Sequence, residues 1–285
     1  MKTRFALGKL AALAAAVLGS ALLALPAQAQ SVTYNQGDLL LGFRKAGVSQ
    51  DVVINIGQAS LYRDATADFS VSVGNLGTLL SDTYGAGWAN DSSLQWAVVG
   101  NPANAGADFN GDTSGTSYAT RDQTTIGTQT GAWSLTSANR GFLSGRLQTL
   151  QNAFDIQTAA SGNSSATIWD NTLQSGVDWT DWMTGPGGLS FGVFTTTQLQ
   201  GSDATGIDYP GTALDLYRLV SGSGGTTGVS YEGTFRIDDT GAVTFGITPA
   251  VGAVPEPSRA LLLAFGLALP LLRRRRSSVG KPVVA

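Results

Sequence analysis

A hairpin signature near residue 240 constrains the fold of this chain more than any other stretch. Polar and apolar side chains alternate along its first arm, whose apolar positions are Tyr231, Phe235 and Ile237. The second arm alternates in the same way, with apolar Val243, Phe245 and Ile247. Between them lies Asp238-Asp239-Thr240-Gly241, a turn sequence whose glycine suits a left-handed position. Period-two alternation on both sides of a turn predicts two antiparallel strands, each with one buried face.

Further strands are predicted from short runs of alternating or continuous apolar residues. These runs are Asp38–Phe43, Asp51–Ile56, Leu94–Val99, Ala166–Trp169, Leu189–Thr195 and Ala213–Leu219. Helical spacing predicts one long helix, with Ser137 as its cap and one apolar face made of Leu143, Leu147, Leu150 and Phe154. A shorter helix is predicted around Leu76, Leu79, Leu80 and Tyr84. We therefore expect a mainly β body, an antiparallel β-sandwich-like fold with one or two helices laid across it.

The amino-terminal end reads as an export signal. Three basic residues, Lys2, Arg4 and Lys9, precede an apolar run from Leu10 to Leu25. Ala27-Gln28-Ala29 then supplies the small-x-small pattern that signal peptidase cleaves. We expect residues 1–29 to be a signal peptide and the exported chain to begin near Gln30. The alternative is a permanent amino-terminal membrane anchor.

The carboxyl-terminal end combines three elements in a fixed order. They are Pro255-Glu256-Pro257, an apolar run over Ala260–Leu272, and the block Arg273, Arg274, Arg275 and Arg276. As a helix the apolar run would be about 20 Å long. The hydrocarbon core of a bilayer is about 30 Å thick. Such a hydrophobic helix suits a transient membrane anchor better than a permanent one, with the arginines as its stop on the cytoplasmic side.

This arrangement resembles the PEP-CTERM sorting signal, the tail of bacterial surface proteins that the membrane protease exosortase processes. The resemblance implies that residues 251–285 form the sorting tail, with Pro255, Glu256 and Pro257 as its recognition motif. The tail of this chain departs from that pattern in having a nine-residue extension after the arginines, Ser277–Ala285. The stretches Gly37–Arg44 and Tyr231–Asp238 are also similar to parts of other PEP-CTERM proteins. The resemblance implies a location, exported and then on the cell surface or outside the cell, and carries no catalytic mechanism.

The exported body between the two signals, residues 30–250, is acidic. Residues 31–255 hold eight basic and 19 acidic side chains, which gives a net charge of −11. Such a charge repels nucleic acid and anionic lipid, so we expect neither as a lasting partner. The chain has no cysteine and no histidine, and Glu232 is the only glutamate in the body. Disulfides, thiolate and histidine chemistry and a serine triad are therefore excluded, and we expect a non-enzymatic protein.

One loop has the beginning of a calcium-binding pattern. Asp108, Asn110 and Asp112 stand at positions one, three and five, as in the loops of dockerins and EF-hands, which this segment resembles over five residues. Thr113 and Ala119 then occupy positions that such loops give to glycine and glutamate. The alternative is an ordinary polar turn. Calcium is the one cofactor that the sequence suggests.

Tryptophans and aspartates gather in a second segment. Its members are Trp169, Asp178, Trp179, Asp181 and Trp182. Flat aromatic faces stack on sugar rings and carboxylates accept hydroxyl hydrogen bonds, so a glycan-binding, lectin-like surface is one interpretation. The other is that the tryptophans fill the core. Asp178 and Asp181 could also be the paired carboxylates of a glycoside hydrolase, although nothing in the sequence marks one of them as buried.

The segment Thr113–Thr136 is rich in hydroxyl groups, and the sequence leaves open whether it is a surface loop or an exposed strand pair. Together these features predict a protein sorted through a PEP-CTERM and exosortase system, with a structural or adhesive role in envelope, exopolysaccharide or biofilm. Its expected partners are signal peptidase, exosortase, the inner membrane for a limited time, and extracellular polysaccharide.

Overall fold

The computed structural model describes residues 30–91, 93–102, 106–123, 125, 127–132, 135–172, 179, 213–222, 224 and 227–247. Several of the predictions above fall outside these residues. They are the signal peptide, the sorting tail, the strand at Leu189–Thr195, and the side chains of Asp178, Asp181 and Trp182.

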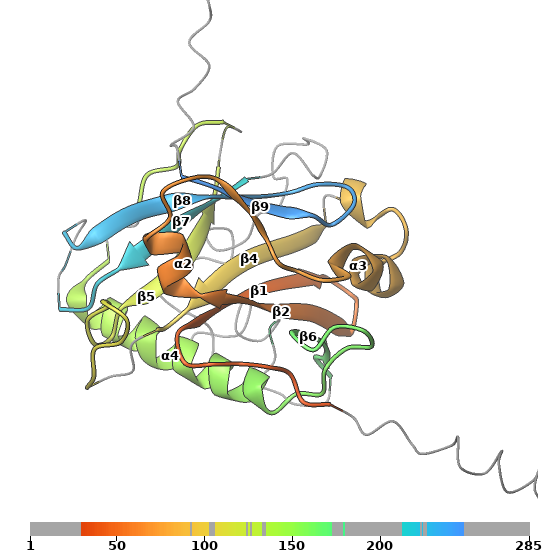
Figure 1. Ribbon diagram of the computed structural model, residues 1–285, viewed down its shortest axis with the longest axis horizontal. Coiled ribbons are helices and arrows are strands. Elements are labelled where there is room, and N and C mark those ends of the chain that lie inside the picture. Colours follow the sequence, from red (N-terminus) through yellow and green to blue (C-terminus); the bar gives the residue numbers. More distant parts are fainter. Residues whose placement is uncertain are drawn as a thin grey trace, which may run out of the picture.

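The described strands form one antiparallel sheet of nine (Figure 1). They are β1 (Asp38–Lys45), β2 (Gln50–Gln58), β3 (Phe69–Val71), β4 (Leu94–Gly100), β5 (Ser117–Asp122), β6 (Ala166–Asp170), β7 (Ala213–Leu219), β8 (Val229–Ile237) and β9 (Val243–Gly246). Their order across the sheet is β3-β9-β8-β7-β5-β4-β1-β2-β6. The mainly β, antiparallel architecture is therefore as predicted.

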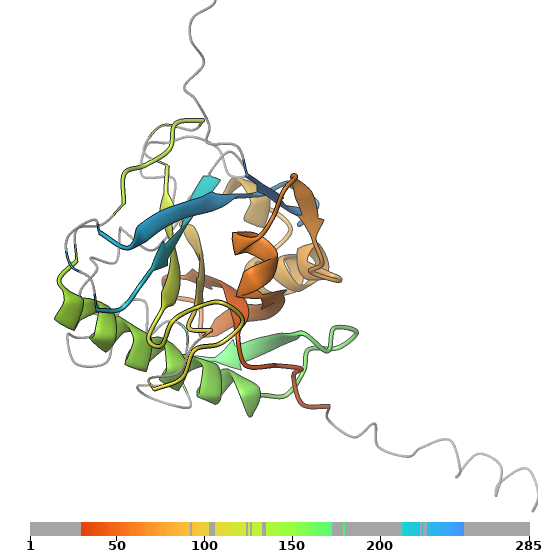
Figure 2. The same cartoon turned by 60° about the vertical axis from the view of Figure 1, so that its left-hand side comes forward.

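The sheet is curled, and its two halves meet at a narrow seam between β4 and β5. Strands β4 and β5 share only two paired positions, Val99 with Ala119 and Gly100 with Tyr118. Beyond them the Thr120 hydroxyl replaces the ladder: it accepts from the Val98 amide at 2.8 Å and donates to the Val98 carbonyl at 3.2 Å. The sheet is curled in both views of the ribbon (Figure 1, Figure 2). The prediction of a mainly β, antiparallel body is met by this single curled sheet.

Each face of the sheet carries its own apolar core. On the inner face, β1 contributes Leu39, Leu41 and Phe43, which pack with residues of the helices α2 (Ala59–Arg63) and α3 (Leu76–Tyr84). On the outer face, Leu40 and Val53 pack with residues of the long helix α4 (Ser137–Asp155). Strict alternation therefore buries both sides of the central strands, which explains their nearly continuous apolar sequences.

The helices were partly predicted. Helix α4 buries the expected face, but its cap is Thr136, whose hydroxyl accepts from the Asn139 amide; Ser137 is the first helical residue. Helix α3 has the expected position, whereas α2 and a short 3₁₀ turn at Trp88–Asn90 were not predicted. No helix among the described residues is long and apolar enough to cross a membrane.

The predicted hairpin is β8 and β9, and Gly241 in its turn has the expected left-handed conformation, with φ of 85°. One detail differs. Leu216 pairs with Gly233 and Tyr217 with Tyr231, so Glu232 is the extra residue of a β-bulge. The bulge changes the alternation, and Tyr231 packs on the outer core while Phe235 lies in the inner one. The prediction that these two side chains share a face was wrong.

The hydroxyl-rich segment is only partly a loop. Its residues Ser117–Asp122 form β5, a central strand with mostly buried side chains. Neither an exposed strand pair nor a purely surface loop describes it. The described residues 127–132 return over the end of β5, where Thr130 donates its hydroxyl to the Asp122 carbonyl.

Candidate functional site

The most concentrated group of charges in the described residues surrounds Asp112. A tight turn places it there: Phe109 and Asp112 exchange both backbone hydrogen bonds, and Asn110 between them has a left-handed φ of 47°. Asp112 then points back into the protein, and its side chain is only 1% exposed. A buried carboxylate needs charged or hydrogen-bonding partners.

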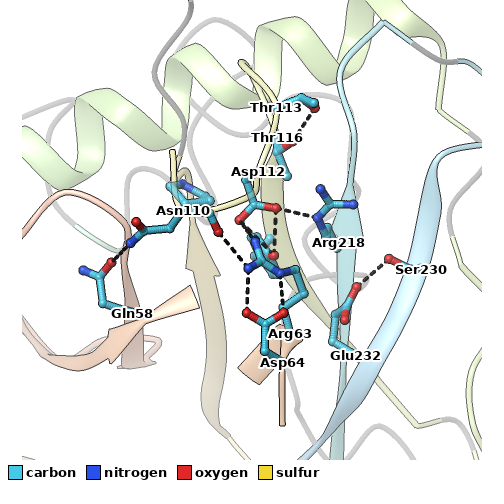
Figure 3. Close-up of polar contacts among 12 residues, drawn as sticks. Gln58, Arg63, Asp64, Asn110, Asp112, Thr113, Thr116, Arg218, Ser230 and Glu232 are labelled. Carbon is cyan, nitrogen blue, oxygen red and sulfur yellow. Dashed lines mark hydrogen bonds and ion pairs between the residues drawn. The ribbon is translucent and has the colours of Figure 1, made fainter. Parts of the chain in front are cut away.

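Two arginines from distant parts of the chain supply these partners (Figure 3). Arg63 at the end of α2 places Nη1 at 3.0 Å from one oxygen of Asp112, and Arg218 on β7 places Nε at 2.5 Å from the other. The Tyr118 hydroxyl on β5 lies 3.1 Å from both oxygens. Burial, and next the charge of Asp112, raise the pKa of Tyr118, so the phenol stays a donor.

Further contacts position the two arginines beside Asp112. Burial alone would lower the pKa of Arg218, but the hydrogen bond and the charge of Asp112 raise it. On its solvent side Arg63 donates two hydrogen bonds to the Asp64 carboxylate, at 2.8 and 2.7 Å. It also donates to the Asn110 carbonyl at 2.7 Å. The group thus ties α2, the turn, β5 and β7 together at one end of the inner core.

Glu232, the bulge residue of β8, lies beside this group (Figure 3). Burial raises the pKa of Glu232, and the charge of Asp112 adds to the rise, while a hydrogen bond from Ser230 and the two arginines oppose it. Glu232 is thus held nearer to its neutral form.

Glu232→Gln should therefore change how stability depends on pH. Because the folded-state pKa of Glu232 is raised, its contribution to stability is complete below the unfolded pKa near 4.5 and is lost as pH rises through the folded value. We expect the variant to gain on the wild type over that window, by less than about 1 kcal/mol because Glu232 is partly solvated. Urea unfolding at a series of pH values measures this, and parallel curves for the two proteins would contradict it.

The residues of the predicted calcium loop have other contacts. Asp108 accepts from the Ser114 amide at 2.9 Å, Asn110 donates to Gln58 at 3.0 Å, and Asp112 faces two guanidinium groups. In the described part of the chain no group of three or more acidic, histidine or cysteine side chains is placed to hold a metal ion. These contacts account for the loop without calcium, which stays an untested prediction.

Two of the three tryptophans singled out above are inside the protein. Trp169 and Trp179 are 2% and 1% exposed and belong to the outer core. Trp179 packs on β1 at Gly42, where an added Cβ would lie 2.2 Å from the indole. A buried ring cannot stack on a sugar, so the core interpretation accounts for these two. Trp182, Asp178 and Asp181 lie outside the described residues.

Sequence reasoning missed Arg63 and Arg218 as partners of Asp112. One signal was available, because Arg218 stands between Tyr217 and Leu219 in a strand whose only other charged residue is Asp215, in a body with few basic residues. A charge in such a strand calls for an opposite charge nearby. No protein-family model matches the chain, no curated protein is detectably similar to it, and no solved structure matches it.

Proposed function

We propose that this chain is an exported surface or matrix protein, sorted by an exosortase through its tail, whose body has a structural or adhesive role. The order of the tail elements carries the proposal: Pro255-Glu256-Pro257, then Ala260–Leu272, then Arg273–Arg276. Pro255 and Pro257 favour an extended backbone that a protease cleft can accept. The apolar run retains the precursor in the inner membrane, and the arginines stop it there.

The described part of the body supports a structural role. Its largest charged group is directed inward, with Asp112 bound by two arginines and a tyrosine, and connects four segments of the fold. Such a closed group leaves no free carboxylate oxygen of Asp112 for substrate chemistry. A secreted hydrolase that uses aspartates would need a carboxyl group open to its substrate. The acidic surface suits a soluble protein in an extracellular matrix.

Replacing the arginine block by alanine, at all four positions 273–276, tests the sorting. We expect the intact chain to be found processed in the envelope or medium of cells that carry an exosortase. The variant should lose retention, so that most of it is released unprocessed. Ser258→Ala is the matched control, because it lies in the tail but outside the three elements. Fractionation with mass spectrometry of the carboxyl terminus measures both steps.

Equal distribution of the intact chain and the arginine variant would contradict the sorting proposal. The structural role has a separate test, in which the purified processed protein is incubated with a panel of extracellular polysaccharides. Hydrolysis of any of them that Asp178→Asn or Asp181→Asn abolishes would replace the structural role with a catalytic one. Retention in the matrix without hydrolysis is the expected result.

A further inference from the structure

A second buried carboxylate, Asp215, brings a hydroxyl and a primary amide together. Asp215 lies on β7, fully buried, and its carboxylate accepts three hydrogen bonds. The donors are Thr234 Oγ1 at 2.8 Å, Gln123 Nε2 at 2.8 Å and the Thr130 amide at 2.7 Å. Within the described residues all three donors are neutral, so this buried carboxylate is held without the arginines that Asp112 has. Burying a carboxylate in this way is costly, and we therefore examine Asp215 as a possible functional group.

The hydroxyl and the amide meet at one atom. Thr234 and Gln123 both donate to Oδ1 of Asp215, so their donor atoms are separated by at most twice 2.8 Å. Register explains the meeting: Thr234 on β8 pairs directly with Asp215, and Gln123 follows β5 on the other side of β7. The carboxylate thus lies between a hydroxyl nucleophile and a carboxamide, and both of these side chains are buried as well.

Both ends of the Gln123 amide are hydrogen-bonded. Gln123 Nε2 faces the carboxylate, and Oε1 accepts from the backbone amide of Gly127 at 2.8 Å. A backbone N–H at the carbonyl oxygen is the group that stabilises the negative charge of a tetrahedral intermediate. Thr234 Oγ1 is also 2.7 Å from the Tyr231 hydroxyl; because the threonine donates its proton to Asp215, the tyrosine is the donor in this pair.

We propose that Thr234 and Gln123 form an intramolecular ester cross-link, with Asp215 as the general base. Asp215 takes the proton of Thr234 Oγ1 while the oxygen forms a bond to Cδ of Gln123. The intermediate carries its charge on Oε1, beside the Gly127 amide. Asp215 then returns the proton to Nε2, the Cδ–Nε2 bond breaks, and ammonia leaves. One hydroxyl and one amide thus become one ester and one ammonia, with no oxidant or other reactant.

The position of the link suits a protein without disulfides. It would join β8 to the end of β5 across β7, and the burial of all three side chains would keep water from hydrolysing the ester. This inference does not depend on the sorting tail and holds or fails independently of it.

Peptide mapping of the folded, purified protein tests the link. We expect the peptides that contain Gln123 and Thr234 to be recovered as one branched species, lighter than their sum by one ammonia. Mild alkali should hydrolyse the ester and separate them, leaving a glutamate side chain at position 123. Mapping is needed because cyclisation of Gln30 or succinimide formation at Asn110-Gly111 also releases ammonia.

Variants assign the roles. Thr234→Ala and Asp215→Asn should abolish the branched species, whereas Thr234→Ser keeps a hydroxyl and should retain it. Thr167→Ala is the matched control, because Thr167 is equally buried but donates to the Thr158 carbonyl. Recovery of separate, unmodified Gln123 and Thr234 peptides from the folded wild type overturns the proposal, whichever variants fold. Loss of ammonia confined to Gln30 or Asn110 has the same consequence.

Discussion

Asp112→Asn is expected to lower the free energy of unfolding by about 3–5 kcal/mol, the usual effect of removing one partner from a buried ion pair. The change leaves Arg63 and Arg218, whose side chains are 16% and 18% exposed, facing a neutral amide instead of a carboxylate. Domains of this kind have total stabilities of about 5–15 kcal/mol. The variant would therefore lose a large part of its free energy of unfolding. Urea unfolding followed by tryptophan fluorescence measures this loss.

Asp64→Asn is the matched control for this prediction. It makes the same chemical change at a carboxylate that also binds Arg63, but Asp64 is 61% exposed. Exposed pairs contribute about 0–1 kcal/mol, so the control should remain near the wild type. Equal losses in the two variants would mean that burial of Asp112 is not the source of its effect.

Gly42→Ala is expected to destabilise the protein by about 3 kcal/mol, at the upper end of the range for overpacked cores. The new Cβ would lie 2.2–2.4 Å from three atoms of the Trp179 indole, a rigid ring that is itself fully buried. Either β1 or the tryptophan has to move. Thermal unfolding, with near-ultraviolet circular dichroism to report the tryptophan environment, would record both the loss and the displacement.

Gly141→Ala separates this clash from the general effect of replacing a glycine. Gly141 lies on the exposed face of α4, and nothing is within 4 Å of the place that its Cβ would take. Alanine is the better helix former, so the control should gain about 0.5–1 kcal/mol. The two substitutions are chemically identical and should have opposite signs. A loss of stability in both would contradict the proposed packing of Trp179 on Gly42.

The elements that local patterns determine were predicted well. Strand β7 has the predicted bounds because its sequence is a mostly apolar run that is buried on both faces. Helix α4 follows from the helical spacing of the apolar residues on its one buried face. Short elements lacked that repetition: β3 has three residues and α2 has five. β5 was missed because its sequence Ser-Tyr-Ala-Thr-Arg-Asp has few large apolar residues, although the sheet buries most of it.

The partners of Asp112 and the order of the strands could not be predicted, because both depend on contacts between residues far apart in the sequence. Asp112 belongs to a loop that looks like a metal site when read alone, and its partner Arg218 is 106 residues away. The strand order depends on long-range pairing in the same way, because β5 and β7 are neighbours in the sheet although α4 and β6 lie between them in the sequence. Glu232 shows the effect of a single bulge, which no alternation pattern reveals.

The narrow seam between β4 and β5 has a mechanical consequence. Within the ladder of strand pairs, tension applied between β1 and β9 passes through that seam, because the seam separates the two strands in the sheet order. Every other junction on this path has at least four registered pairs, and the seam has two. Under shear the strand ladder should separate at the seam first, so that the protein would lengthen there before its other strand pairs break.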